Sequence, residues 1–189
     1  MIPPGNIFLI GMPGAGKTSV GEALAQRLNL TFIDTDREMI QRTGVSIATV
    51  FEVEGEPGFR QRETRLIMAL VQGSGILMAT GGGAVLATAN RNALRQHGTV
   101  VYLHVPLSCL WERTQRDPRR PLLRNSDAYT TLKNLLETRE PLYRETAHLI
   151  VETGRQSVSK LAETVIEHLY AASFLPQPAV QPEENHAAR

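Results

Sequence analysis

A glycine-rich segment near the N-terminus has the residue types and spacing needed to bind phosphate. Residues 11–18 read GMPGAGKT and match the pattern GxxxxGK[ST], between a short apolar run and a stretch with helical spacing of apolar residues. Glycines let successive backbone N–H groups converge on phosphate oxygens, Lys17 can reach the β- and γ-phosphates, and the Thr18 hydroxyl suits Mg²⁺. A glycine-rich turn with a chance lysine is the weaker alternative. The residues predicted to bind a nucleoside triphosphate are Gly14, Ala15, Gly16, Lys17, Thr18 and Ser19.

Two carboxylates, Asp34 and Asp36, follow a second short apolar run. In open α/β sheets ligands bind beyond the carboxyl ends of the strands, which is where these residues are expected. One carboxylate could support Mg²⁺ through water, and the other could orient or deprotonate an acceptor hydroxyl. An Asx turn followed by a helix N-cap explains the same residues equally well.

A second group of residues has the chemistry to bind an anionic acceptor. Arg60 and Glu63 share a helix face, where the glutamate can fix the guanidinium toward a substrate carboxylate, although a solvated ion pair is commoner. Arg62 and Arg65 are predicted to be surface residues. Three glycines at 81–83 favour close backbone approach to a ligand, with a plain flexible loop as the alternative.

Two further segments contain arginines that could bind substrate or could have only a structural role. Arg139 lies near an expected helix end, where contact with the helix dipole is a sufficient explanation. Residues 113–123 hold four arginines, which is unremarkable in a solvated loop but is what a lid over a transferring phosphate requires. We therefore predict a mobile lid over about 115–127.

These candidate residues lie at the ends of elements that alternate between strand and helix. The predicted strands are 7–10, 31–34, 76–80, 99–105 and 148–152. The predicted helices are 18–30, 36–42, 57–72, 107–114, 130–139 and 157–170. Continuously apolar strands separated by helices indicate an α/β fold with a parallel sheet covered on both faces. One domain is expected over 1–170, and the proline-rich residues 171–189 are predicted to form a disordered tail.

Composition excludes several classes of protein. With 42% hydrophobic and 21% charged residues the chain is globular, and its net charge of +1 does not suit a nucleic-acid partner. The single cysteine, Cys109, cannot form an internal disulfide. No apolar run approaches the roughly 20 residues of a membrane span, and the N-terminus lacks a targeting leader, so we expect a cytoplasmic protein without a membrane partner.

Taken together, the motifs resemble those of the shikimate kinases, a branch of the P-loop proteins related to nucleoside-monophosphate kinases. The resemblance runs from about residue 6 to 170 and adds six motifs to the phosphate loop. They are DTD at 34–36, GVSI at 44–47, FRxxE from Phe59, TGGG from Thr80, RPLL from Arg120 and REPLY from Arg139. It implies a three-layer P-loop kinase fold with a five-stranded parallel sheet in the order 2-3-1-4-5. It also implies a monomer that phosphorylates the 3-hydroxyl of shikimate with ATP and Mg²⁺.

The resemblance also implies a role for individual residues. Asp36 would bind the shikimate hydroxyls and act as the candidate base, and Asp34 would serve the Mg²⁺ shell with Thr18. Arg60 and Arg139 would clamp the shikimate carboxylate. The remaining positions implied to contact a substrate are Gly82 and Gly83 near the ring, Arg120 on the phosphates from a substrate-enclosing lid, and Arg113, Thr114, Gly154, Arg155 and Gln156 around the adenine.

Two other functions compete with this interpretation. A related small-molecule kinase, such as a gluconate or adenylate kinase, would share the phosphate loop but has no evident use for DTD, FRxxE and TGGG together. A nucleotide-dependent switch or ATP-binding module would have little need for two extra arginines that bind a carboxylate.

Overall fold

Five short apolar segments pair into a single parallel sheet in the computed structural model, which describes residues 5–115 and 127–175. The strands are β1 (Ile7–Ile10), β2 (Thr31–Asp34), β3 (Ile76–Ala79), β4 (Thr99–His104) and β5 (Leu149–Glu152). Their order, β2-β3-β1-β4-β5, confirms the expected topology. β1 is central, with Ile7 opposite Leu77 on one side and Thr99 on the other. The uninterrupted apolar character of β1 follows from this burial between two neighbours and two helical layers.

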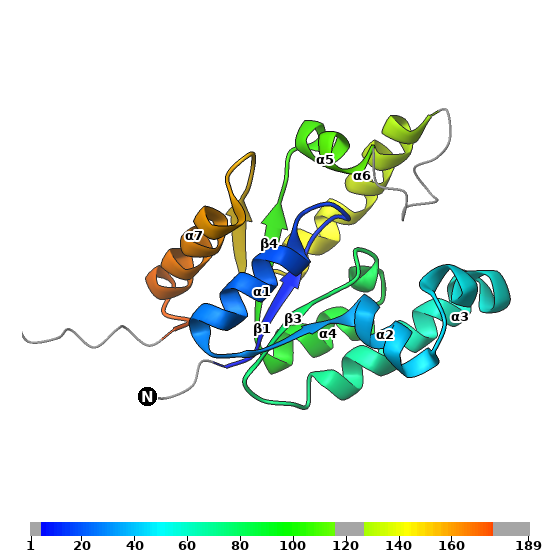
Figure 1. Cartoon of the computed structure of the whole chain (residues 1–189), viewed down its shortest axis with the longest axis horizontal. Helices are drawn as coiled ribbons and strands as arrows, with labels where there is room; N and C mark the ends of the chain where they lie inside the picture. The colour runs from blue at the N-terminus through cyan, green and yellow to red at the C-terminus, as the bar shows by residue number, and fades with distance from the viewer. Residues whose placement is uncertain (1–4, 116–126, 176–189) are drawn as a thin grey trace, which may run out of the picture.

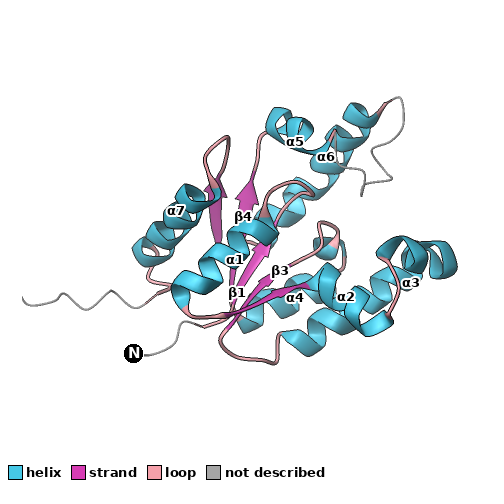
Figure 2. Ribbon diagram, in the orientation of Figure 1, coloured by secondary structure: helices cyan, strands magenta, loops and turns pink. Residues whose placement is uncertain are grey.

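Helices cover both faces of the sheet and give the expected three layers (Figures 1 and 2). The helices are α1 (Lys17–Leu28), α2 (Thr35–Thr43), α3 (Ile47–Leu70), α4 (Thr88–His97), α5 (Leu107–Thr114), α6 (Ala128–Thr146) and α7 (Val158–Ala171), with a 3₁₀ turn at Ala84–Leu86. α1 and α7 lie side by side on one face, and α4 and α6 lie on the other. α2 and α3 extend beyond the β2 edge, on the side of the molecule away from α7.

α3 is longer than predicted because it consists of two helical halves joined at a kink. Gly55 at the junction has φ 68° and ψ −179°, a conformation that favours glycine. The carboxylate of Glu54 receives two hydrogen bonds from Arg62 across the junction, at 2.5 and 2.7 Å, and Phe51 stacks on Phe59 at 4.5 Å. The prediction of 57–72 covered only the second half, since the first half has an acidic end and a glycine that interrupts the apolar period.

α6 also runs beyond its predicted end, and α4 was not predicted. α6 continues through Pro141 to Thr146, because Leu132, Arg139 and Tyr143 are buried along its length. Arg139 therefore lies inside a helix, and the reading of this residue as a contact at a helix C-terminus is wrong. α4 is polar over most of its surface and buries only three residues, so its sequence has a weak apolar stripe.

The folded region also extends past the predicted start of the tail. After α7, the backbone N–H of Phe174 donates to the carbonyl of Leu169, and Leu175 is buried in the core. Residues 172–175, which were predicted to belong to the tail, are therefore part of the folded region, and residues 176–189 lie outside the described part. Within the residues described, no helix is both long and apolar enough to cross a membrane.

Candidate active site

The phosphate loop connects β1 to α1 in a conformation that depends on glycine. Gly14 and Gly16 have φ of 87° and 88°, and a Cβ on Gly14 would also lie 2.6 Å from the methyl group of Thr114. α1 begins at Lys17, so its N-terminal N–H groups and partial positive charge face the loop. The ammonium of buried Lys17 donates to the carbonyls of Gly11 and Met12, at 2.8 and 3.0 Å. The loop thus assembles a cation and backbone donors around one position suited to phosphate.

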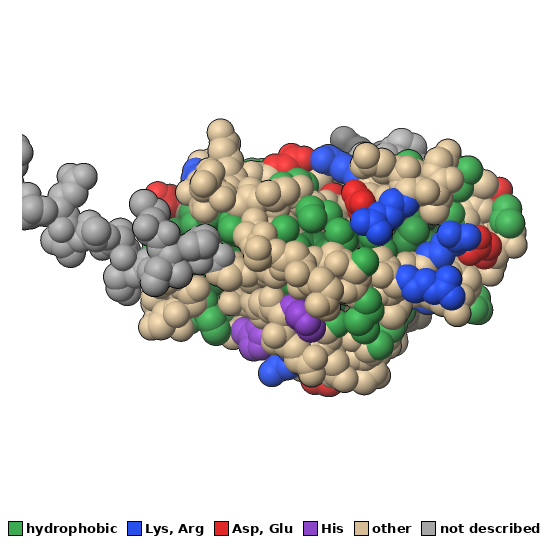
Figure 3. Space-filling view, turned by 90° about the horizontal axis from the view of Figure 1, so that it is seen from below, with side chains coloured by type: hydrophobic (Ala, Val, Ile, Leu, Met, Phe, Trp, Pro, Cys, Tyr) green, Lys and Arg blue, Asp and Glu red, His purple; other side chains and the backbone are tan. Residues whose placement is uncertain are grey.

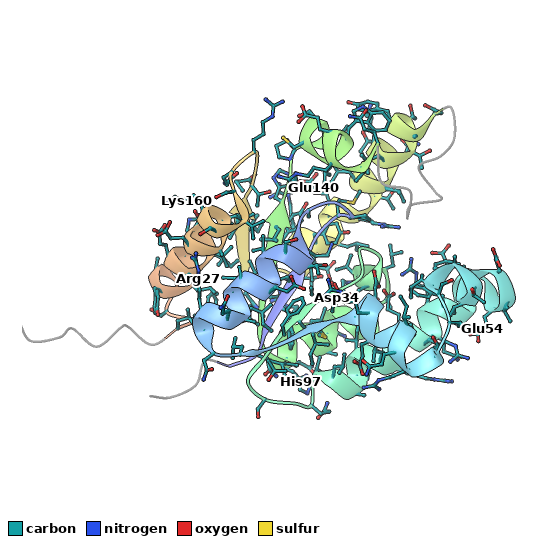
Figure 4. The ribbon with its side chains drawn as sticks, in the orientation of Figure 1. Arg27, Asp34, Glu54, His97, Glu140 and Lys160 are labelled. Atoms are coloured by element: carbon teal, nitrogen blue, oxygen red, sulfur yellow. The ribbon has the colours of Figure 1, made fainter. Side chains whose placement is uncertain are left out.

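Asp34 joins the phosphate loop to the acceptor side. Its Oδ1 accepts from the backbone N–H groups of Asp36 and Arg37 at 3.0 and 3.1 Å and so caps α2, while its Oδ2 accepts from the Thr18 hydroxyl at 2.7 Å. Figure 4 shows Asp34 at the centre of the molecule, where β2 meets α2. The predicted helix cap is confirmed for Asp34, and its second carboxylate oxygen binds the Thr18 hydroxyl.

The Thr18 and Asp34 oxygens fit the requirements of Mg²⁺. Magnesium prefers oxygen ligands and is commonly held by one or two protein groups together with substrate phosphates. No group of three or more His, Cys, Asp or Glu side chains placed to hold a metal occurs among the described residues. The Thr18 hydroxyl and the Asp34 carboxylate oxygen lie 2.7 Å apart beside the phosphate loop. This pair suits a magnesium ion that is also bound by substrate phosphates, and it does not form a site made of protein ligands alone.

The glycines after β3 pack against charged side chains on the acceptor side. A Cβ on Gly81 would lie 2.8 Å from Oε1 of Glu63 and 3.0 Å from Oδ1 of Asp36, and one on Gly83 would lie 2.3 Å from Arg60. The backbone N–H of Gly81 donates to the hydroxyl of Thr35 at 2.9 Å. The close packing of Glu63, Asp36 and Arg60 against this loop thus explains why residues 81 and 83 are glycines. Contact of Gly82 and Gly83 with a ligand stays a prediction.

Arg60 and Glu63 form a partly buried ion pair, in contrast to the solvated pair that is commoner on helices. Nη1 of Arg60 lies 2.7 Å from Oε2 of Glu63, whose side chain is only 3% exposed. Burial raises the pKa of the Glu63 carboxyl, and the nearby Asp36 carboxylate adds to this, against the opposing charges of Arg60 and Arg139. Glu56 accepts further hydrogen bonds from Arg60, and Phe59 lies under the guanidinium at 5.1 Å. Arg60 is therefore fixed on several sides.

Arg139 reaches the same cluster from α6, whereas Arg60 and Glu63 belong to α3. Its residue is only 8% exposed, and its charge acts on both Glu63 and the hydroxyl of Tyr143. Asp36, on the exposed side of α2, completes a group of two arginines and two carboxylates. The structure thus brings together Asp36, Arg60 and Arg139, which lie far apart in the sequence. Such a group can bind a small molecule that has a carboxylate at one end and hydroxyl groups at the other.

The residues predicted to surround adenine lie on the other side of the phosphate loop. Arg113 donates to the carbonyl of Gly14 at 3.3 Å and to the carbonyl of Gly154. The amide oxygen of Gln156 accepts from the N–H of Gly154 at 2.6 Å, and the exposed Arg155 pairs with Glu112 at 2.6 Å. Contact with a nucleotide base stays a prediction. Arg120 and most of the expected lid lie outside the described residues.

Tyr143 was assigned no role from the sequence, although it is the last residue of the REPLY motif. Its hydroxyl donates to the carbonyl of Gly82 at 2.5 Å. The partner is a backbone atom 61 residues away, so no local pattern indicates this bond. The only signal in the sequence was a tyrosine four residues after Arg139, on the same helix face.

A separate hollow between α2 and α3 lies away from this cluster. It is lined by Met39, Arg42, Thr43, Arg62, Arg65 and Leu66. Figure 3 shows basic side chains gathered on this side of the molecule with acidic ones beside them. Arg62 and Arg65 are exposed, as predicted, and Arg42 and Arg62 are paired with glutamates.

Comparison with known proteins identifies the family. The sequence profile of the shikimate kinase family matches residues 13–170. The chain is 52% identical to a shikimate kinase of Nitrosospira multiformis over 89% of this chain and 87% of that protein, and 49% identical to one of Nitrosomonas europaea over 96% and 88%. The structure of shikimate kinase from Acinetobacter baumannii in complex with shikimate superposes with a TM-score of 0.86, at 43% identity, over 89% of this chain and 94% of that one. A phosphate loop that faces a two-arginine cluster across one sheet edge agrees with these matches, and we conclude that the chain belongs to the shikimate kinase family.

Proposed function

We propose that the chain transfers the γ-phosphoryl group of ATP to the 3-hydroxyl of shikimate, giving shikimate 3-phosphate and ADP. The observation that carries this proposal is the shared position of Lys17 and the Arg60–Arg139 cluster at the carboxyl edge of one sheet. Membership of the shikimate kinase family supports it directly.

The acceptor is recognised at both of its ends. Arg60 and Arg139 bind the shikimate carboxylate, since a guanidinium presents parallel N–H donors to carboxylate oxygens. Glu63 holds Arg60 in place through the 2.7 Å pair, so little side-chain freedom is lost on binding. Gly82 and Gly83 lie near the ring of the substrate, and the lack of a side chain lets their backbone pack against Pro13 and Arg60.

Asp36 orients the hydroxyl that is phosphorylated. It lies in the first turn of α2, two residues after Asp34, which accepts from Thr18, so an acceptor bound to its carboxylate lies near the phosphate loop. The carboxylate accepts the hydroxyl proton as the bond to phosphorus forms.

The nucleotide is held from three directions. Lys17 and the N–H groups of Gly14 to Ser19 bind the β- and γ-phosphates, and Arg120 contacts the transferring group. Thr18 and Asp34 hold Mg²⁺, which when bound neutralises phosphate charge. The adenine lies between Arg113 with Thr114 and the segment at Arg155 and Gln156. We further propose that the enzyme works as a monomer in the cytoplasm, without nucleic-acid or membrane partners.

The experiment is an ADP-release assay with ATP, Mg²⁺ and one of shikimate, gluconate, AMP or no acceptor. We expect turnover with shikimate only, and we expect Lys17→Ala to nearly abolish it because this ammonium is held inside the loop by the carbonyls of Gly11 and Met12. Faster turnover with gluconate or AMP would assign the chain to a related kinase. Equal ADP release without any acceptor would make it an ATPase or a switch.

A further inference from the structure

The hydroxyl of Tyr143 lies between two segments that the proposed function assigns to the acceptor. It donates to the carbonyl of Gly82 at 2.5 Å, and the charge of Arg139, about one helical turn earlier on α6, acts on the same hydroxyl. Tyr143 is 0% exposed, so no solvent molecule competes at the surface of this side chain. The Tyr143 hydroxyl is therefore bonded to the glycine loop and lies beside an arginine that the proposed function assigns to the substrate carboxylate.

The ring that carries this hydroxyl is held on both sides. Tyr143 stacks on Tyr102 with centroids 4.9 Å apart, and its oxygen lies 3.7 Å from the sulfur of Met12 in the phosphate loop. Arg139 and Tyr143 are four residues apart on α6, which places both side chains on one helix face. The position of the hydroxyl is thus fixed independently of a ligand.

The protonation state of the hydroxyl suits both interactions. Burial raises the pKa of Tyr143 well above its ordinary value, against the opposing charge of Arg139, so the phenol keeps its proton. A neutral hydroxyl can donate its proton to the carbonyl of Gly82 while a lone pair interacts with the charge of Arg139.

We infer that Tyr143 is a positioning residue for the acceptor: it orients Arg139 and holds the Gly82 backbone at a fixed distance from it. The inference rests on the proposed function. The two segments border the acceptor from opposite sides, and a change in their spacing would shift the carboxylate clamp relative to Asp36. Tyr143 acts through these groups and makes no contact with the reacting atoms.

Tyr102 provides a matched control for a purely structural role. It is equally buried, at 1% exposure, and shares the stacked ring contact, but its hydroxyl is buried without a hydrogen-bond partner among the described residues. Replacement of either tyrosine by phenylalanine removes one buried oxygen and keeps the stacked rings. Only at Tyr143 does the change remove a link between acceptor-binding segments.

The experiment compares Tyr143→Phe with Tyr102→Phe in steady-state assays of the full chain. We expect Tyr143→Phe to raise the KM for shikimate by about tenfold or more while the KM for ATP changes by less than about twofold. Tyr102→Phe should leave both values within about twofold of the wild type. With a shikimate analogue whose carboxylate is reduced to a hydroxymethyl group, Tyr143→Phe should cost less than it does with shikimate, because Arg139 then has no carboxylate to meet.

Several results would overturn the inference. Equal effects of the two variants, or equal increases in the KM for shikimate and for ATP, would make Tyr143 a packing residue. Fully additive effects of Tyr143→Phe and Arg139→Lys would show that the tyrosine does not act through Arg139. Wild-type protein without shikimate-dependent turnover would overturn the proposed function together with this inference. Wild-type activity with an unaffected Tyr143→Phe variant would overturn the inference alone.

A second measurement applies even where Tyr143→Phe fails to fold. In wild-type protein labelled with ¹³C at the tyrosine Cζ, shikimate should shift the Tyr143 resonance, because the bound carboxylate offsets the charge that Arg139 presents to the hydroxyl. The Tyr102 resonance, assigned with Tyr102→Phe, should move less. A Tyr143 resonance that is unmoved by saturating shikimate would refute the inference.

Discussion

Gly83 packs so closely against Arg60 that a Cβ at this glycine would lie 2.3 Å from the guanidinium Nη2. Gly83 has φ −95°, which alanine also adopts without backbone strain. Replacement by alanine therefore tests only the steric contact with Arg60. We predict that Gly83→Ala displaces the guanidinium and raises the KM for shikimate by about tenfold, with little loss of stability because a flexible side chain can move aside. Steady-state kinetics and urea unfolding measure the two effects.

Gly5→Ala is the matched control, because a Cβ there meets no atom within 4 Å. It should leave the KM for shikimate unchanged. A Gly83→Ala enzyme with wild-type affinity for shikimate would show that Arg60 is not needed in its present position.

The clamp arginines and the lid arginine should respond differently to truncation. Arg60→Ala and Arg139→Ala should chiefly raise the KM for shikimate, because its carboxylate is present in both the ground state and the transition state. Arg120→Ala should instead lower kcat, because its proposed partner is charge on the transferring phosphate. Steady-state kinetics with both substrates distinguish the two classes. An intact kcat in Arg120→Ala, together with a loss of kcat alone in Arg60→Ala, would reverse the assignment.

Asp36 can be tested for base catalysis against simple orientation of the acceptor. Asp36→Asn keeps the size and one acceptor oxygen but removes the charge, whereas Asp36→Ala also removes the hydroxyl contact. We expect Asn to be nearly as damaging to kcat as Ala, since general-base assistance contributes about 10²–10⁴-fold. Measurement of kcat at saturating shikimate decides between them. At least half of the wild-type kcat in Asp36→Asn would leave only the orienting role.

Asp34 caps α2 and is proposed to serve Mg²⁺, and a substitution can separate these two roles. Asp34→Asn retains an oxygen that caps α2 but loses the charge that faces Thr18. We predict a higher Mg²⁺ requirement and a lower kcat, with the free energy of unfolding reduced by less than about 1 kcal/mol. The measurements are a Mg²⁺ titration of activity and urea unfolding.

Ser46→Ala serves as the control for loss of a helix cap. Ser46 caps α3 by accepting from the N–H of Thr49 at 3.1 Å, away from the phosphate loop. It should reduce stability by about 1 kcal/mol without a change in Mg²⁺ dependence. The same Mg²⁺ dependence in Asp34→Asn as in the wild type would argue against a metal role for Asp34.

Glu63 should make the stability of the protein depend on pH in a defined direction. Burial raises the pKa of its carboxyl in the folded state above the ordinary value of 4.5, so the folded protein holds this proton more tightly than the unfolded chain. The contribution to stability is therefore fully present below pH 4.5 and is lost as the pH rises through the raised pKa. We expect the free energy of unfolding of the wild type, relative to Glu63→Gln, to fall across that interval. Urea unfolding as a function of pH measures it, and a relative stability that increases with pH would contradict the assigned direction.

The sequence predicted the sheet better than the helices around it, for physical reasons. A strand buried on both faces must be apolar throughout, and β1 was predicted at its observed bounds. The edge strand β2 was also predicted at its observed bounds, although its residues are partly exposed. α4 was missed because only Asn90, Ala93 and Leu94 are buried along it. The ends of helices depend on contacts made in the folded state, which a local pattern does not record.

In the candidate site, residues that belong to continuous sequence motifs were predicted, whereas contacts between distant segments were not. Lys17 and Asp34 belong to motifs that are continuous in sequence, and their placement followed from the strands before them. The buried state of the Arg60–Glu63 pair was not predictable, because it depends on Gly81, which packs on Glu63 from another strand end. The link from Tyr143 to Gly82 could not be predicted either, since a tyrosine side chain does not specify which distant carbonyl it will meet.

The bonds of Arg113 to Gly14 and Gly154 have a consequence for the order in which the protein can be completed during synthesis. The two carbonyls come from near the beginning of the chain and from the segment that follows β5, the edge strand formed last in sequence. A ribosome must therefore release nearly the whole domain before this arginine can join the two segments. Until that point the phosphate loop is present without this contact, so a nascent or truncated chain that ends before Gly154 lacks part of the nucleotide site that we propose. Completion of that proposed site thus coincides with completion of the sheet.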